Sequence, residues 1–220
     1  MLQTASHAPL VEPATEPLAW AAVHDEPSLP VAHSLWIGDR LPPLAQACLR
    51  SLQRVGHKVV LHTYGPVSGV PHGVELADAG ETMPASEITR HRDTGSFALF
   101  SDRFRFRLLQ RGADLWVDCD IYCLKPLPRA DYLFGWEHGR SINCSVLALP
   151  ANSPLLNDLV EFSLKPGMPP WFGPLRRNWF GLLERLGRVK GAEDLPWGTI
   201  GPAALTHFAH KHGKAHLALH

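Results

Sequence analysis

The sequence has few of the features that would place it in several broad classes of protein. Only four of its 220 residues are cysteines, and their spacing shows no zinc-type pairing, so we expect reduced and mostly buried thiols. Lysine plus arginine equals aspartate plus glutamate, with 21 of each, so no global field attracts nucleic acid or anionic lipid. There is neither a signal-peptide pattern nor a run of 18 apolar residues. We therefore expect a cytoplasmic protein with no nucleic-acid partner and at most peripheral membrane association.

The apolar content sets the number of domains. At 45% of 220 residues, it is enough for one sizeable core and fits one α/β domain better than two small ones. Residues 1–30 mix Ala, Pro, Glu and Thr without periodicity, so we expect a disordered, Ala/Pro-rich leader there. The folded domain is predicted to span residues 31–220.

Strand-like and helix-like patterns alternate through the first half of that domain. Such alternation favours a mostly parallel sheet with helices on its faces. We predict a loop over 70–84, and the other segments as follows: strands over 32–38, 57–65, 114–120, 132–137 and 142–150, and helices over 42–56, 96–112, 153–164, 174–187 and 201–213.

Two acids stand one residue apart after the apolar run "LWV". In an extended segment, Asp118 and Asp120 would point to the same side while Cys119 turns away. Carboxylates roughly 5 to 6 Å apart repel by about 3 kcal/mol at an effective dielectric near 20. A divalent cation such as Mn²⁺ or Mg²⁺ would offset this repulsion, since it takes hard oxygen ligands from carboxylates and phosphates. The alternative is a pair of solvated acids at a strand exit.

A second charged pair lies on the helix before that strand. Asp102 and Arg105 are at i, i+3, a spacing that fits either an ordinary helix ion pair or two groups aimed at a ligand.

The segment "FSDRFRFRLLQRGADLWVDCDIYCLKPL" resembles the sugar-binding region of DXD glycosyltransferases, the family 32 type. These include α-1,6-mannosyltransferases, α-1,4-galactosyltransferases and the glucosyltransferase domain of clostridial toxins. "HSLWIGD", "SINCSVLALPANSPLL" and "GTIGPAALTHF" resemble other blocks of that family, so the resemblance covers about residues 32–208. The matching positions of the sugar-binding region are Ser101, Asp102, Arg105, Leu109, Trp116, Asp118 and Asp120.

The chain departs from the family pattern at three places. Ala113-Asp114 stands where the family has Gly-Gly, and Ile200 stands where it has Thr. The family also continues well beyond the last block, so we expect that the domain is C-terminally incomplete at His220.

The resemblance implies a GT-A type fold, with a Rossmann-like, mostly parallel sheet flanked by helices. It implies a metal-dependent, retaining transfer from a nucleoside-diphosphate sugar to a glycan, a lipid-linked acceptor or another hydroxyl, as in polysaccharide biosynthesis. A UDP-sugar is favoured and GDP-mannose is possible.

The resemblance also gives a role to individual residues. It implies that Trp36 stacks on the base and that Asp120 binds the metal. Asp118 would contact ribose or sugar and help the metal through water. Asp102 and Arg105 would hold donor hydroxyls or phosphate oxygens, and Asn143 the transferred sugar. The catalytic set is then Asp102, Arg105, Asp118 and Asp120.

Other interpretations remain open. Trp36 fits a core position, Asn143 a turn or strand edge, and Arg105 a surface partner of Asp102. The segment 171–180 fits either an acceptor lip or a helix with a core side and a surface side. Five histidines between 207 and 220 are scattered around a helix end, which favours a solvated surface.

Two other functions also remain open. One is a nucleotide-sugar-binding module without turnover. The other is a phosphohydrolase of the haloacid-dehalogenase type, which needs Thr or Val where Tyr122 stands.

Overall fold

A six-stranded sheet forms the centre of the protein in a computed structural model that describes residues 28–165, 167–189 and 191–220. The strand order is β3-β2-β1-β4-β6-β5. Strands β3, β2, β1 and β4 are parallel, whereas β6 runs antiparallel to both β4 and β5. Their bounds are β1 Ala32–Trp36, β2 Val59–Thr63, β3 Glu75–Asp78, β4 Leu115–Val117, β5 Leu133–His138 and β6 Ser141–Ala148.

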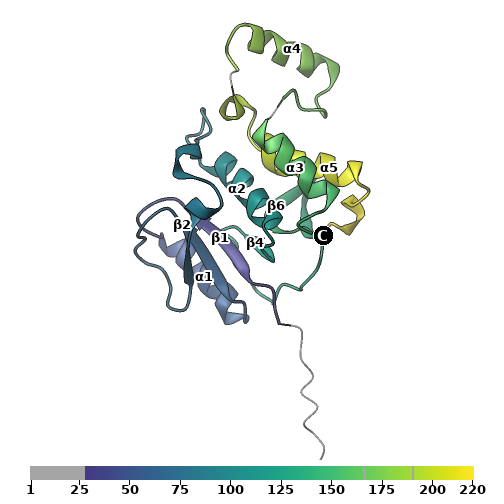
Figure 1. Cartoon of the computed structure of the whole chain (residues 1–220). Coiled ribbons are helices and arrows are strands. Elements are labelled where there is room, and N and C mark those ends of the chain that lie inside the picture. The colour runs from purple at the N-terminus through teal and green to yellow at the C-terminus, as the bar shows by residue number, and fades with distance from the viewer. Residues whose placement is uncertain (1–27, 166, 190) are drawn as a thin grey trace, which may run out of the picture.

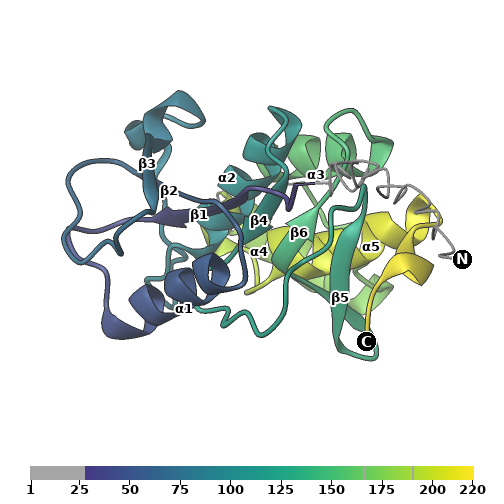
Figure 2. The ribbon, with the colours of Figure 1, turned by 90° about the horizontal axis from the view of Figure 1, so that it is seen from below.

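Helices cover both faces of this sheet. Helix α1 lies on one face, while α2, α3 and α5 pack on one another on the opposite side (Figures 1 and 2). Helix α4 stands away from the sheet (Figure 1). The bounds are α1 Pro43–Arg54, α2 Ala98–Gln110, α3 Pro154–Leu164, α4 Pro174–Arg185 and α5 Ala204–Lys211, with a π-helical turn at Thr199–Ala203 and 3₁₀ turns at Ala79–Glu81, Ala85–Glu87, Ala192–Asp194 and Ala215–Leu217. Of the helices in the described ranges, none combines the length and hydropathy that a membrane span needs.

Local sequence explains where α1 begins and ends. Its first residue is Pro43, whose fixed φ suits the first turn and whose missing N–H costs no hydrogen bond there. Just after its end, Gly56 has a φ of 100°, which only glycine adopts without strain. The residues buried between these points recur at helical spacing and face the sheet: Ala45, Cys48, Leu49, Ser51 and Leu52.

Helix α2 is instead buried on most of its circumference. The apolar stripe predicted through Phe97, Phe100, Phe104 and Leu108 is buried except at Phe97, which is half-buried, and Phe106 is buried on another face. Two buried clusters of apolar side chains lie on the two faces of the sheet, one with α1 and the other with α2, α3 and α5. Helix α2 packs on both β4 and α3, so the polar side chains of Asp102 and Arg105 in its first turns are buried as well.

Two sequence expectations need correction. The predicted loop over 70–84 contains the edge strand β3, which pairs with β2. The predicted strand over 114–120 is ordered as strand only at Leu115–Val117. There the chain turns, since the Ile121 N–H donates to the Asp118 carbonyl at 3.1 Å. Asp118 and Asp120 therefore do not share one face of an extended segment, and that prediction is wrong.

The expected leader falls almost entirely outside the described residues. Of residues 1–30, only 28–30 are described, and they contact the domain: the Pro30 carbonyl lies 2.9 Å from His57 Nδ1, and Arg129 donates to the carbonyls of Ser28 and Leu29. The four cysteines are all free thiols, and three of them are buried.

Candidate functional site

The candidate site lies where the carboxyl ends of β1 and β4 meet the first turns of α2. Trp36 ends β1, and Asp118 follows the neighbouring parallel strand β4. Asp102 and Arg105 come from α2. On the other side of β4, β6 brings in Asn143, and the Asp118 N–H donates to the Ser145 carbonyl at 2.8 Å. In open α/β sheets, ligands bind at this edge.

Arg105 is the centre of the site. Its Nη1 donates to Asp118 Oδ2 at 3.3 Å and to the Cys144 carbonyl at 2.6 Å. Its Nη2 lies 3.1 Å from Asp118 Oδ1 and 3.3 Å from Asp102 Oδ1. The Ser101 hydroxyl and carbonyl accept from Nη2 and Nε. Since all three guanidinium nitrogens already donate to protein groups and the side chain is only 4% exposed, Arg105 holds the two acids in place.

Burial and the two acids act on Arg105 in opposite directions. Burial alone would lower the pKa of the guanidinium, but Asp118, Cys144 and Asp102 together raise it above its ordinary value. Trp116 packs beneath the charge, with Arg105 Cζ 4.9 Å from the ring centroid. Trp116 is 1% exposed and so lies in the core.

The two acids of the Asp-x-Asp motif differ sharply in their surroundings. Both oxygens of Asp118 accept hydrogen bonds from protein: Oδ1 from Trp116 Nε1 at 2.7 Å and from Arg105, and Oδ2 from Arg105. Asp120 is exposed and pairs with no other residue in the described part of the chain. Asp120 therefore has a carboxylate free of protein hydrogen bonds, whereas Asp118, 24% exposed, lines both cavities with its oxygens already bonded to protein.

Asp102 is buried between Arg105 and the turn at Gly201. Burial raises the pKa of Asp102, Arg105 lowers it and Asp118 raises it, and together they bring it to about 6. The Cys144 thiol donates to Asp102 Oδ1 at 3.5 Å. Burial raises the pKa of that thiol well above its ordinary value, so Cys144 stays protonated and is no nucleophile. A Cβ on Gly201 would lie 2.6 Å from Asp102 Cγ, so only glycine permits this approach.

Two adjoining cavities are lined by the six candidate site residues: Trp36, Asp102, Arg105, Asp118, Asp120 and Asn143. The first, here the Asn143 cavity, has a volume of about 450 Å³ and is lined by Asp102 and Asn143 among others. The second, the Trp36 cavity, has a volume of about 540 Å³ and is lined by Trp36 and Asp120 among others. Arg105 and Asp118, together with Ala98, line both cavities and mark where they meet.

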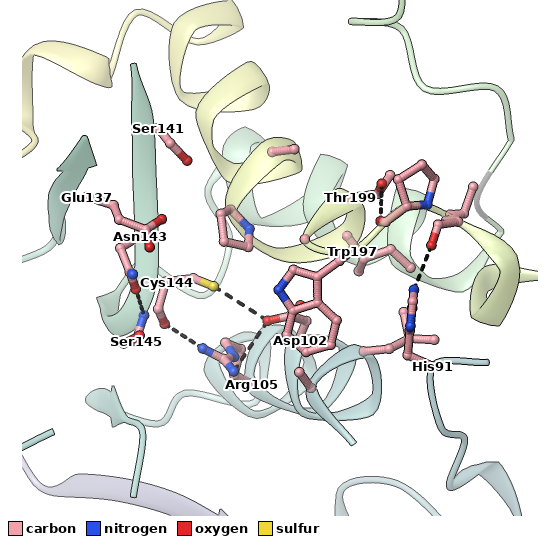
Figure 3. Close-up of a pocket in the computed structure, with 18 of the residues that line it drawn as sticks. His91, Asp102, Arg105, Glu137, Ser141, Asn143, Cys144, Ser145, Trp197 and Thr199 are labelled. Carbon is pink, nitrogen blue, oxygen red and sulfur yellow. Dashed lines mark hydrogen bonds and ion pairs between the residues drawn. The ribbon is translucent and has the colours of Figure 1, made fainter. Parts of the chain in front are cut away.

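Figure 3 shows how the Asn143 cavity is built. Asn143, Ser141 and Glu137 lie on one side, Asp102 and Arg105 lie below, and Trp197, Thr199 and His91 lie on the other side. Asn143 Oδ1 accepts from the Ser145 N–H at 2.6 Å, which fixes the orientation of the amide. These polar groups around the cavity thus come from β5, β6, α2, the loop before α2 and the segment before α5.

Several of these lining residues were not predicted from the sequence. His91 Nε2 lies 3.0 Å from the Leu195 carbonyl, and Nδ1 accepts from the Thr94 N–H, so the ring ties the loop before α2 to the segment before α5. Trp197 packs edge-on against His91 with ring centroids 5.5 Å apart and is 58% exposed. A single histidine and a single tryptophan carry no local pattern, so only proximity in the fold identifies them.

The departures from the family pattern have local explanations. Gly112 alone makes the turn before β4, with a φ of 95°. Asp114, at a position where the family has glycine, binds Arg129 at 3.0 Å and accepts from the Val31 N–H at 3.1 Å. Ile200 is buried against the cavity, and the neighbouring Thr199 hydroxyl donates to the Pro196 carbonyl.

The C-terminal histidines face different surroundings. His212 binds Asp158 at 2.7 Å, His207 packs on Trp171, and His210 and His220 lie near Trp136. Within residues 28–165, 167–189 and 191–220, no group of three or more His, Cys, Asp or Glu side chains is placed to hold a metal by itself.

Comparison with known proteins supports the fold. Neither a family model nor a curated protein matches the chain. A solved structure described as "PaToxG Glycosyltransferase" is similar with a TM-score of 0.50 and 12% sequence identity, and the match covers 84% of this chain and 70% of that chain. At that identity the likeness concerns the fold alone. The predicted α/β class, with a mostly parallel sheet flanked by helices, is confirmed, and a known glycosyltransferase has a similar fold.

Proposed function

We propose that this protein is a glycosyltransferase that uses a nucleoside-diphosphate sugar and a divalent cation. One observation carries the proposal: two cavities meet at Arg105 and Asp118, with Trp36 and the unpaired Asp120 in one and Asp102 and Asn143 in the other. A donor of this kind has two dissimilar halves joined by a diphosphate, and two joined cavities with different linings suit such a molecule.

The Trp36 cavity suits the nucleotide half. Trp36 is half-buried, and its indole nitrogen has no hydrogen-bond partner among the described residues. Gly38 leaves room for the ring, since a Cβ there would lie 3.2 Å from that nitrogen. Arg90 also lines the cavity and adds a positive charge. We infer that Trp36 offers a surface on which a base stacks.

The Asn143 cavity suits the sugar half. Its polar groups include a carboxylate, an amide and several hydroxyls, which match the hydroxyls of a hexose, and the exposed ring of Trp197 supplies an apolar wall. Above pH 6, Asp102 is mostly ionised and acts as an acceptor for sugar hydroxyls. Asn143 would contact the transferred sugar with the part of its amide that Ser145 does not occupy.

The residues present fit a cation that arrives with the donor. Asp120 supplies an open carboxylate, and a site with one or two carboxylates plus substrate phosphates is the usual way in which Mg²⁺ is held. Asp118 is already occupied by Arg105 and Trp116, so we assign it to a water-mediated or ribose contact. When bound, Mn²⁺ or Mg²⁺ supplies positive charge at the departing diphosphate.

The chain's own contribution is then binding and electrostatic positioning. Arg105 keeps Asp102 and Asp118 apart and fixed, and does not reach the phosphates itself, because its donors are taken. Retention of the anomeric configuration is proposed from the family resemblance, and no residue is assigned as the general base. NMR of the product shows its anomeric configuration and so tests the proposed retention.

Calorimetry followed by product analysis tests the proposal. UDP, GDP, UDP-glucose and GDP-mannose are each titrated with Mn²⁺ and with EDTA, and slow donor hydrolysis or transfer to a hydroxyl acceptor is then measured. Mn²⁺-dependent binding with turnover supports a transferase. Binding with neither hydrolysis nor transfer points to a binding module, and no binding of any nucleotide overturns the proposal.

Phosphate release from simple monoesters would instead indicate a phosphohydrolase. That chemistry needs Asp118 as a nucleophile, whereas both of its oxygens accept hydrogen bonds from Arg105 and Trp116. We therefore expect no release.

A further inference from the structure

Helix α4 is exposed around almost its whole circumference. Phe180 is its only buried residue, packed on Phe172 with ring centroids 5.6 Å apart. The helix stands away from the sheet (Figure 1). Phe180 thus forms the core side of a helix, which is one of the two interpretations of 171–180. The surface side of that helix exposes large apolar residues.

That surface side carries a stripe of large apolar residues. Leu175, Trp179, Leu182 and Leu186 are 87%, 61%, 46% and 63% exposed. Their spacing of four, three and four residues places them within about 60° of the helix circumference. Phe180 lies about 130° from the centre of that stripe, so the stripe faces away from the residue that attaches the helix. Here we call these four residues the α4 stripe.

Basic residues border the α4 stripe. Between residues 174 and 189, four arginines face one acid, Glu184, in a chain that is neutral as a whole. By helical spacing, Arg176 and Arg185 lie about 90° to either side of the stripe, and Arg176 Cζ rests 4.2 Å from the Phe172 ring centroid. Arginines at that angle can reach polar headgroups while the apolar side chains point into an acyl layer. Charge and apolar surface are therefore combined on a single helix.

We propose that α4 lies flat on an anionic membrane surface, with the α4 stripe inserted and the arginines at the headgroups. A short helix with a Trp- and Leu-bearing face and an Arg-bearing flank is the form that interfacial helices take. Anionic lipid complements the positive helix. A second copy of this chain fits less well, since stripe-to-stripe contact would bring two arginine-rich helices together. The inference does not depend on the proposed function.

Vesicle co-sedimentation of the full chain tests this inference. We expect binding to vesicles of phosphatidylcholine and phosphatidylglycerol in equal parts, and binding that weakens as NaCl is raised. Trp179→Asp should lower the partition coefficient at least ~10-fold, because it removes an inserted ring and adds a charge that anionic lipid repels. The double variant Arg176→Glu with Arg185→Glu should lose the preference for the anionic vesicles.

A matched control separates the stripe from general surface hydrophobicity. Leu124 is 77% exposed and lies outside α4, so Leu124→Asp should bind vesicles as the unchanged chain does. Circular dichroism should be unaltered in all variants, and so should the melting curves of Trp179→Asp and Leu124→Asp, whose changed residues are exposed. The double arginine variant should melt slightly lower, because Arg176 packs on Phe172. Failure of the unchanged chain to bind, or equal binding by Trp179→Asp, overturns the proposal. So does a dimer that sediments without vesicles and is lost in Trp179→Asp.

Discussion

Replacement of Arg105 by lysine tests whether this guanidinium holds the site together. Arg105 donates to Asp102, Asp118, the Cys144 carbonyl and Ser101 from three nitrogens in a fixed plane. Lysine keeps the charge, but its ammonium has three donors at one point and cannot reach all these acceptors. With two hydrogen bonds lost, we expect the free energy of unfolding to fall by about 2 to 3 kcal/mol.

Urea denaturation with linear extrapolation measures this loss. Arg107 lies on the same helix but is partly exposed, 3.8 Å from Glu87. Arg107→Lys is therefore the matched control, and its effect should stay within about 0.5 kcal/mol. Arg105→Lys should also weaken Mn²⁺-dependent nucleotide binding, because Asp118 loses its support. If the two lysine variants have equal stability and equal affinity, Arg105 forms only an ordinary ion pair on the helix and does not hold the site together.

A double variant identifies the acids as the cause. Asp102→Asn removes one of the charges that Arg105 compensates, so Arg105→Lys should cost less in that background than in the unchanged chain. Strictly additive losses would show that Arg105 and Asp102 do not interact energetically.

Other variants test neighbouring parts of the site. Gly201→Ala should destabilise the fold by about 1 to 3 kcal/mol, since its Cβ would overlap Asp102, and unchanged urea denaturation would refute that close approach. Folding raises the pKa of Asp102 from 3.8 to about 6, so its contribution favours folding below pH 3.8 and is lost as pH rises through 6. The free energy of unfolding should therefore fall relative to Asp102→Asn between these pH values, whereas a constant difference would contradict the shift. Trp36→Ala should weaken nucleotide binding by about 1 to 3 kcal/mol in calorimetry. Trp36→Phe keeps an aromatic ring, so its affinity should be closer to that of the unchanged chain. An effect on melting temperature alone would return Trp36 to the core.

Most of the fold could be predicted from the sequence, because the segments that form its helices have strong local patterns. Pro43 at the first position of α1, Gly56 after its end and the aromatic run of α2 each fix a helix end or face. Strand β3 was missed because it is an edge strand with exposed residues on both faces, so "ELAD" shows no apolar alternation. The strand at 115–117 was predicted too long because the turn after it depends on a hydrogen bond that composition does not encode.

Spacing along the chain links only those candidate residues that are close in the sequence, whereas Trp36 and Asn143 were assigned from the family resemblance. Asp102, Arg105, Asp118 and Asp120 lie within one helix-strand unit, so their spacing is readable. The wall formed by His91 and Trp197 depends on segments more than 100 residues apart, joined by the contact between His91 and the Leu195 carbonyl. The different states of the two motif acids follow from Arg105 and Trp116, and no spacing rule distinguishes them.

The central claim is that Asp120 binds a cation that in turn binds a diphosphate, and Asp120→Asn tests it most directly. Calorimetry with UDP and GDP is run with Mn²⁺ and with EDTA for the unchanged chain, for Asp120→Asn and for Asp131→Asn, an exposed acid outside both cavities. The account predicts that Asp120→Asn binds nucleotide in Mn²⁺ no better than the unchanged chain does in EDTA, while Asp131→Asn keeps full affinity. Full Mn²⁺-dependent affinity in Asp120→Asn would contradict the claim.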